Sequence, residues 1–240
     1  MSAMKKRYIG KIIWRCLAFV LCGIMYLYYP KAFDVLEGMN FFRTLSPLHA
    51  LWALWVVDML AQIIPMKSKI SLGSLKLFKN RFKPNPKEVD RAELYAYMKA
   101  ANKKAVLVFV LWCLLIGAIA AVYYTKLIGK KELFMLTALF YIFDLVCVLI
   151  WCPFRFLMGN RCCTTCRIFN WDHFMMFSPI IFLGGFYAIS LVALSCVDFL
   201  VWELSVYLYP ERFWEKTNVA LRCSECTDKL CHKKCSKVCK

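Results

Sequence analysis

Charged residues are scarce in this sequence, at 20% of 240 residues, whereas hydrophobic residues make up 61%. Globular domains are ordinarily about 45–50% apolar, so a water-soluble domain of this length could not bury so much apolar surface. Glycine and proline are also sparse, and the sequence has neither a repeat of solenoid length nor a low-complexity segment. The fold class that remains is all-α, a polytopic bundle of transmembrane helices.

Histidine is rarer still, with three copies. We expect His49 and His173 at opposite faces of the membrane, which argues against a haem held between two histidines. The sequence also lacks a Walker loop, a G-x-S-x-G motif, an H-E-x-x-H motif and a dinucleotide fingerprint. Neither haem nor a nucleotide is therefore expected as a cofactor, and whether the protein is an enzyme stays open.

Acidic residues are outnumbered, since 32 lysines and arginines face 15 acids and give a net charge of +17. In a membrane protein such an excess indicates orientation signals and contact with anionic lipids. Nucleic acid is not an expected partner, because no basic helix stands apart from the apolar stretches. We expect a multi-pass protein of the cell membrane (plasma or inner membrane) whose partner is the lipid bilayer.

Long apolar stretches are what the sequence does have. Four of them contain 17 to 20 residues, close to the about 20 that cross about 30 Å of hydrocarbon. They are residues 12–29, 48–64, 105–124 and 133–151. A fifth stretch, 174–209, is predicted to be one helix, because its breaks at Ser178-Pro179 and Gly184-Gly185 lie too near its start to leave a full span before them. Residues 1–209 would thus form a five-span domain, followed by a basic, cysteine-rich tail, 210–240.

The distribution of basic residues predicts the orientation. The N-terminal segment through Arg15 carries 5 lysines and arginines, and the segments between the second and third spans and between the fourth and fifth bring this total to 19. The other two loops carry 5. By the positive-inside rule the N-terminus is cytoplasmic. Five spans then place the tail outside, although it carries 8 basic residues. A sixth crossing, or a re-entrant break at Gly184-Gly185, would instead return the tail to the cytoplasm.

The cytoplasmic loop 65–104 is predicted to have two parts. Apolar and basic residues are interleaved from Lys69 to Lys83, as in an amphipathic segment lying on an anionic leaflet. Asn85-Pro86 then has the pattern of a helix start, and the helix is expected to run from Pro86 to Lys103.

The loop 152–173 contains the first of two cysteine clusters, Cys152, Cys162, Cys163 and Cys166. The C-x-x-C spacing within it is that of a metal knuckle or a redox dithiol, and four thiols suffice for zinc or an iron–sulfur cluster. Neighbouring basic residues are expected to favour the thiolate form: Arg155, Arg161 and Arg167. The alternative is a turn that holds reduced cysteines.

The second cluster lies in the tail and consists of Cys223, Cys226, Cys231, Cys235 and Cys239. Disulfides are the default outside the cell, whereas metal binding is the better interpretation inside it. The spacing departs from the bacterial ferredoxin pattern. The tail therefore predicts cysteine chemistry without specifying which kind.

Two acids lie deep within apolar stretches. Asp58 and Asp144 are each about 15 Å from the outer end of a span, near the middle of the membrane. An ionised aspartate there costs at least about 2.5–3.5 kcal/mol, so each is expected to be paired, protonated or facing the bundle interior. They predict a proton or cation relay or a soft-metal site that uses Asp144 and Cys147, or else a structural hydrogen bond between the second and fourth spans. Asp198 and Glu203 are expected to emerge at the far interface, and Asp172 to cap a helix.

Three functions remain. The leading one is an integral membrane protein with metal–thiolate clusters, either an iron–sulfur redox component or a zinc-binding or other metal-handling protein. The first alternative is an ion- or proton-coupled transporter or channel component that uses Asp58 and Asp144. The second is a structural membrane protein with no catalytic or transport role.

Overall fold

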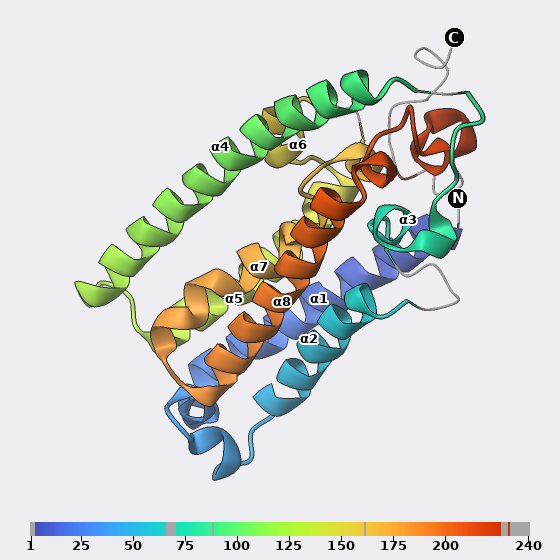
Figure 1. The fold of residues 1–240 in the computed structure, drawn as a ribbon. Coiled ribbons are helices and arrows are strands. Elements are labelled where there is room, and N and C mark those ends of the chain that lie inside the picture. The colour runs from blue at the N-terminus through green and yellow to red at the C-terminus, as the bar shows by residue number, and fades with distance from the viewer. Residues whose placement is uncertain (1–2, 66–70, 88, 161, 227–229, 231–240) are drawn as a thin grey trace.

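The computed structural model describes residues 3–65, 71–87, 89–160, 162–226 and 230, and within these ranges it contains helices and turns but no β-strand (Figure 1). The long helices are α1 (Ala3–Tyr28), α2 (Leu48–Ile63), α4 (Arg91–Tyr124), α5 (Lys130–Leu149) and α8 (Phe186–Leu208). The short ones are α3 (Ser74–Leu77), α6 (Pro153–Met158) and α7 (Asp172–Phe177). The 3₁₀ turns are η1 (Pro30–Leu36), η2 (Asn40–Phe42), η3 (Lys79–Arg81), η4 (Cys163–Thr165), η5 (Phe169–Trp171), η6 (Ser178–Leu183), η7 (Pro210–Phe213), η8 (Val219–Leu221) and η9 (Cys223–Glu225). The predicted all-α fold class is confirmed.

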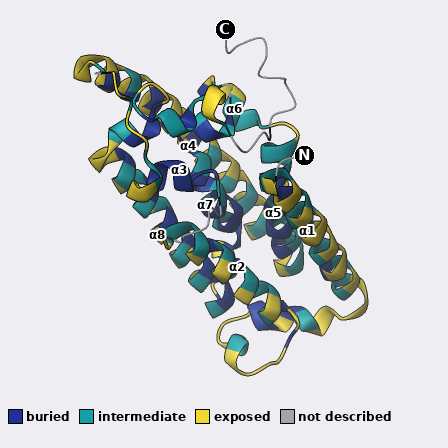
Figure 2. Ribbon diagram, turned by 90° about the vertical axis from the view of Figure 1, so that its right-hand side faces the viewer, coloured by how far each residue is buried: buried dark blue, intermediate teal, exposed yellow. Residues whose placement is uncertain are grey.

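Helices α1, α4, α5 and α8 are long and apolar enough to cross a membrane, and α2 is a shorter apolar helix of 16 residues. Large apolar side chains are exposed on their outer surfaces, among them Ile13 and Leu17 of α1 and Val106 and Leu114 of α4. Figure 2 shows exposed residues along the outside of α1 and buried ones around α7. Exposed apolar surface costs about 25 cal/mol per Å² in water but not in lipid. The surface is therefore that of a membrane protein.

Neighbouring helices in the bundle form a series of contacts: α1 packs on α5, α5 on α7, α7 on α8, and α8 on α2. Aromatic side chains fill the space between them. The Trp55 ring of α2 lies 5.8 Å from Phe134 of α5 and 5.1 Å from Phe177 of α7, centroid to centroid. Helix α4 contacts α6 and η6 at the edge of the bundle. This series of contacts encloses α7 between longer helices.

Helix α4 differs from the expected interfacial helix followed by a separate span. It is continuous over 34 residues, which corresponds to about 51 Å. It begins after Asp90, whose carboxylate accepts a hydrogen bond from the backbone N–H of Ala92. Asn85, the predicted cap, binds the C-terminal segment instead, because its backbone N–H donates to the Thr217 carbonyl at 3.0 Å.

The stretch 174–209 is not one helix, and this part of the prediction is wrong. Helix α7 continues into η6, the chain turns at a glycine pair, and α8 runs back beside α7 (Figure 1). The rings of Phe174 and Phe199 are 4.8 Å apart, and Trp171 Nε1 donates to Glu203 Oε1 at 2.7 Å. An earlier residue of the first segment thus contacts a later residue of α8. The segment of α7 and η6 and helix α8 therefore form an antiparallel helical hairpin.

Two glycines permit this turn. Gly184 has a φ of +67°, in the left-handed region that favours glycine. A Cβ atom on Gly185 would lie 2.2 Å from the carbonyl oxygen of Leu36, so only glycine allows η1 to approach the turn. The next residue completes the contact, since the Phe186 N–H donates to the Gly38 carbonyl at 2.9 Å.

The hairpin returns the chain to the end of the bundle where α1 begins (Figure 1). We call this the basic end; it comprises the start of α1 and the described parts of 71–90, 152–171 and 210–226. Asn218 Nδ2 donates to the Leu75 carbonyl at 3.1 Å, and the Val219 N–H to the Lys83 carbonyl at 2.8 Å. The expectation that the tail lies at the opposite end is therefore wrong for residues 210–226. Cys231, Cys235 and Cys239 lie outside the described residues.

The segment 71–83 packs against protein, whereas the sequence suggested that it lies on lipid. Leu72, Leu77 and Lys76 are buried, and Arg212 of η7 donates to the Leu77 carbonyl at 3.3 Å. The tail therefore covers the apolar side of this segment. Lys79 remains exposed on its outer side.

Candidate functional site

Arg15 of α1 is the centre of a charged cluster inside the bundle. The residue is 3% exposed, and its guanidinium binds acids from two other helices. Nη1 lies 2.7 Å from Asp144 Oδ2 on α5, and Nη2 lies 3.1 Å from Asp58 Oδ2 on α2. Nη1 also donates to the Tyr141 carbonyl at 2.6 Å, and the guanidinium lies 3.7 Å above the Tyr141 ring. The two acids singled out in the sequence are thus brought together by one buried arginine.

Two further polar residues extend the cluster along α1 and α2. Lys11 Nζ lies 2.9 Å from Asp58 Oδ1, one helical turn before Arg15. Gln62 lies one turn after Asp58, and its Nε2 donates to Asp172 Oδ2 on α7 at 3.1 Å. The spacing of four residues puts each pair on one helix face. The acids of α2, α5 and α7 therefore belong to one network.

His173 of α7 lies fully buried between three carboxylates. Its Nδ1 is 3.4 Å from Asp198 Oδ2 on α8 and 3.6 Å from Asp172 Oδ1, and its Nε2 is 3.8 Å from Asp58 Oδ2. None of these contacts has hydrogen-bond geometry, and both imidazole nitrogens and both Asp198 oxygens lack a hydrogen-bond partner. The expectations that His173 lies at the surface and Asp198 at the far interface are wrong, because the hairpin puts both inside.

This cluster holds more acid than base. Its fixed cations are Lys11 and Arg15, and its carboxyl groups belong to Asp58, Asp144, Asp172 and Asp198. One negative charge is unbalanced when His173 is protonated, and two when it is neutral. An unbalanced charge in a low-dielectric interior is costly. The cluster is therefore chemically suited to take up protons or a cation.

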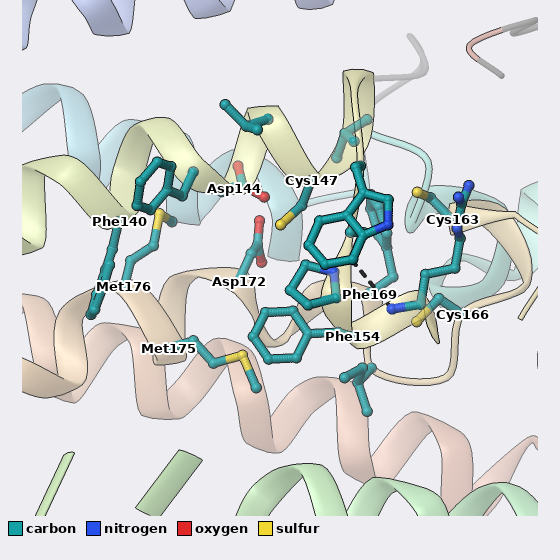
Figure 3. Close-up of a pocket in the computed structure, with 18 of the residues that line it drawn as sticks. Phe140, Asp144, Cys147, Phe154, Cys163, Cys166, Phe169, Asp172, Met175 and Met176 are labelled. Carbon is teal, nitrogen blue, oxygen red and sulfur yellow. Dashed lines mark hydrogen bonds between the residues drawn. The ribbon is translucent and has the colours of Figure 1, made fainter. Parts of the chain in front are cut away.

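A cavity of about 390 Å³ adjoins the cluster (Figure 3). Asp144 and Asp172 face each other with the Cys147 thiol beside them, between Phe140 and Met176 on one side and Cys163 and Cys166 on the other (Figure 3). Aromatic rings form much of the remaining wall: Trp112, Phe140, Phe143, Trp151, Phe154 and Phe169. The cavity thus extends from the cysteine loop to the acids through apolar surroundings.

The thiols around the cavity differ in their ionisation. A hydrogen bond with Cys147 lowers the pKa of Cys152, whose sulfur also accepts from the backbone N–H of Arg155 at 3.3 Å. Burial raises the pKa of Cys163 to about 12 and also raises that of Cys166. The expectation that nearby arginines favour the thiolate is therefore wrong for Cys163 and Cys166, because burial outweighs the positive charge.

The described thiols do not form a compact ligand set. In the part of the chain that the structure describes, one group of three or more His, Cys, Asp and Glu has all its ligand atoms within 4.8 Å of one another, and it contains no cysteine: Asp172, His173 and Asp198. Leu230 packs in one apolar cluster with Cys163, so this point of the tail lies near the first cysteine cluster. Metal ligation stays a prediction for both clusters: Cys152, Cys162, Cys163, Cys166, Cys223 and Cys226.

Arg167 and Glu203 attach the cysteine loop to α8. The two Nη atoms of Arg167 bind the two carboxylate oxygens of Glu203 at 2.7 and 2.6 Å. Lys76 supports the loop from the other side, where its Nζ donates to the Cys166 carbonyl at 2.5 Å. Lys76 is wholly buried, and this burial lowers its pKa to about 8. Glu203 thus lies at the basic end and not at the far interface that the sequence suggested.

Sequence reasoning singled out Asp58 and Asp144 and missed the five other ionisable members of the cluster: Lys11, Arg15, Asp172, His173 and Asp198. Arg15 was counted only as a basic residue of the N-terminal segment, although it follows Ile12 and Ile13 inside an apolar helix. Its position four residues after Lys11 was the available signal, since that spacing puts both cations on one face. His173 and Asp198 gave no such signal, because their proximity depends on the hairpin.

Comparison of the chain with protein-family models, curated proteins and solved structures finds no match.

Proposed function

We propose that the protein is a cation-coupled membrane transport protein, a carrier or channel component, in which the cluster around Arg15 binds the transported proton or cation. One observation carries this proposal: four aspartates share the bundle interior with two fixed cations and one histidine. Ionisable residues inside a membrane are costly, and they ordinarily mark ion pathways or proton relays.

The cavity supports the same proposal. Asp144 and Asp172 line it, and it extends toward the basic end beside Cys163 (Figure 3). The hairpin of α7 and α8 brings His173 and Asp198 into the bundle interior beside Asp58, where ionisable residues ordinarily mark ion pathways.

A topology accompanies the proposal. With the N-terminus in the cytoplasm, α1, α2, α4 and α5 alternate in direction, and the hairpin returns the chain to the cytoplasmic side. Arg212, Lys216 and Arg222 of the tail then join the cytoplasmic excess of basic residues, in agreement with the positive-inside rule. Exposed lysines of the basic end, such as Lys79, would contact anionic lipids of the cell membrane.

Flux measurement tests this function. Proteoliposomes with the wild-type protein should carry a pH-dependent cation or proton current, and Asp58→Asn and Asp198→Asn should abolish it. Glu37→Gln is the matched control, because Glu37 pairs with Lys130 on the exposed surface. No current above that of empty liposomes, or equal currents in all variants, would reject the proposal and leave a structural role for the cluster.

A second candidate is the metal–thiolate function, as an iron–sulfur redox component or a zinc-handling protein. The observation that favours it is that four thiols line the same cavity: Cys147, Cys152, Cys163 and Cys166. Soft thiolates suit zinc and iron–sulfur clusters. Elemental analysis and visible absorption of anaerobically purified protein test this candidate, which predicts iron or zinc that is lost in Cys163→Ser and Cys166→Ser.

A further inference from the structure

His173 points one imidazole nitrogen at two carboxylates without a hydrogen bond to either. Nδ1 lies 3.4 Å from Asp198 Oδ2 and 3.6 Å from Asp172 Oδ1. His173 is 0% and Asp198 1% exposed, yet neither imidazole nitrogen, neither Asp198 oxygen nor Asp172 Oδ1 has a hydrogen-bond partner. Buried polar groups are ordinarily satisfied, so this concentration of unsatisfied donor and acceptor atoms needs a physical explanation.

The distances fit ligands around one metal ion. An N–H···O hydrogen bond is about 2.7–3.2 Å long, shorter than both separations. Neighbouring ligands at bond lengths of about 2.0–2.2 Å lie roughly 3.0–3.5 Å apart in octahedral or tetrahedral coordination. We propose that Asp172, His173 and Asp198 bind a divalent transition-type cation of the zinc, manganese or iron(II) class. The donor set of one imidazole and two carboxylates suits these ions.

The surroundings support the ligands. A metal-bound histidine generally directs its second nitrogen toward a carboxylate, and His173 Nε2 faces Asp58 at 3.8 Å. Asp58 is itself held by Lys11 at 2.9 Å and by Arg15 at 3.1 Å. On the other side, Gln62 Nε2 donates to Asp172 Oδ2 at 3.1 Å and leaves Oδ1 for the ion.

The charge balance points to a divalent ion. A metal-bound histidine is neutral, which leaves four aspartates against Lys11 and Arg15 and hence two negative charges. One divalent cation neutralises them. This inference rests on the proposed function because it names the ion of the same cluster, but binding can be measured without transport.

Cobalt and zinc binding to the full-length protein tests the site. Detergent-purified, chelator-treated wild-type protein should bind one Co²⁺ with ligand-field absorption and without a thiolate-to-cobalt charge-transfer band, and Zn²⁺ should displace it. Asp198→Asn should lose this binding, whereas Glu37→Gln should keep it. Gln62→Ala removes only the bond to Asp172, so we expect it to weaken affinity about 10- to 100-fold while the protein stays monodisperse.

The cysteines provide the decisive comparison. Replacing Cys152, Cys162, Cys163 and Cys166 by serine should leave the cobalt spectrum unchanged. A charge-transfer band in the wild-type protein, or binding that survives Asp198→Asn, would overturn the proposal in favour of a thiolate site. Absence of saturable binding would overturn it in favour of a protonated His173. Stoichiometric binding without flux would support the metal site while contradicting the transport function.

Discussion

Arg15 Nη1 and Asp144 Oδ2 lie 2.7 Å apart, although 129 residues separate them in the chain. This contact ties the first long helix to α5 in the bundle interior. It also places a fixed positive charge beside an acid that would otherwise be isolated from water. Removing one partner of a buried pair leaves the other uncompensated, so the two residues should be strongly coupled.

We predict that Arg15→Gln lowers the free energy of unfolding by about 3–5 kcal/mol, because Asp144 and Asp58 would lose their buried partner. Equilibrium unfolding in mixed micelles measures this change. Adding Asp144→Asn to Arg15→Gln should cost less than the sum of the two single variants, since the second change removes the stranded charge. Lys130→Gln breaks an exposed pair with Glu37 and should cost at most about 1 kcal/mol. Equal losses for Arg15→Gln and Lys130→Gln would contradict burial of the pair.

Gly185→Ala should destabilise the hairpin. The new Cβ would lie 2.2 Å from the Leu36 carbonyl oxygen and 3.0 Å from the Gly38 nitrogen, and both of these are backbone atoms that cannot rotate away. We expect a loss of about 1–3 kcal/mol, in the range of overpacked sites, measured as a lower midpoint of thermal unfolding. Gly117→Ala is the control, because nothing lies within 4 Å of its Cβ position on α4 and alanine favours helix. If the two variants melt alike, the close approach at Gly185 does not exist.

The position of the tail predicts from which side of the membrane an impermeant thiol reagent reaches Cys223. Cys223 is exposed at the basic end, as is Arg91, whereas Leu45 is fully exposed in the loop before α2 at the other end. In a background with the other cysteines replaced by serine, an impermeant thiol reagent should label Cys223 from the same side as Arg91→Cys and from the side opposite to Leu45→Cys. Labelling of Cys223 together with Leu45→Cys would restore the five-span topology.

Lys76 predicts a pH dependence of stability. Burial lowers its pKa to about 8 from the ordinary 10.5, so between these values the unfolded chain binds more protons than the folded one. The contribution of Lys76 to the free energy of unfolding must therefore rise between pH 8 and pH 10.5, by on the order of 3 kcal/mol. Cys163 acts in the opposite direction at higher pH, because its pKa is raised to about 12.

Comparison with Lys76→Met isolates the lysine from these thiols. The free energy of unfolding of the wild type relative to Lys76→Met should increase from pH 8 to pH 10, as followed by chemical unfolding at each pH. The same comparison at pH 6 and pH 7 should show no slope, since Lys76 is protonated in both states there. A difference that stays constant from pH 6 to pH 10 would show that Lys76 keeps its ordinary pKa.

Apolar length and composition were sufficient to predict a helical fold with membrane-spanning helices. They could not predict the turn at Gly184-Gly185, because the apolar stretch continues on both sides of it and the segment that packs on it, Leu36 to Gly38, is far away in sequence. Because the turn was missed, the tail was predicted at the wrong end of the bundle. The same error put His173 and Asp198 at opposite membrane faces, although their side chains lie 3.4 Å apart.

The sequence also could not predict which acids pair with Arg15. Arg15 lies at the start of an apolar stretch, and whether such a residue faces lipid headgroups or the bundle interior depends on which helices pack beside it. Here α5 packs against α1 and supplies Asp144. The cysteine pattern predicted a ligand set from spacing alone, whereas burial within the loop decides which thiols ionise.

Infrared difference spectroscopy of the purified protein tests the cation-binding cluster most directly, because the carboxyl bands report protonation and ligation of buried aspartates. On a shift from acid to neutral pH, or on addition of Zn²⁺, we expect carboxyl bands that change in the wild type and in Glu37→Gln but are lost or altered in Asp172→Asn and Asp198→Asn. Spectra of the two aspartate variants that superimpose on the wild type under both challenges would show that these acids form inert ion pairs, and would contradict a cluster that takes up cations.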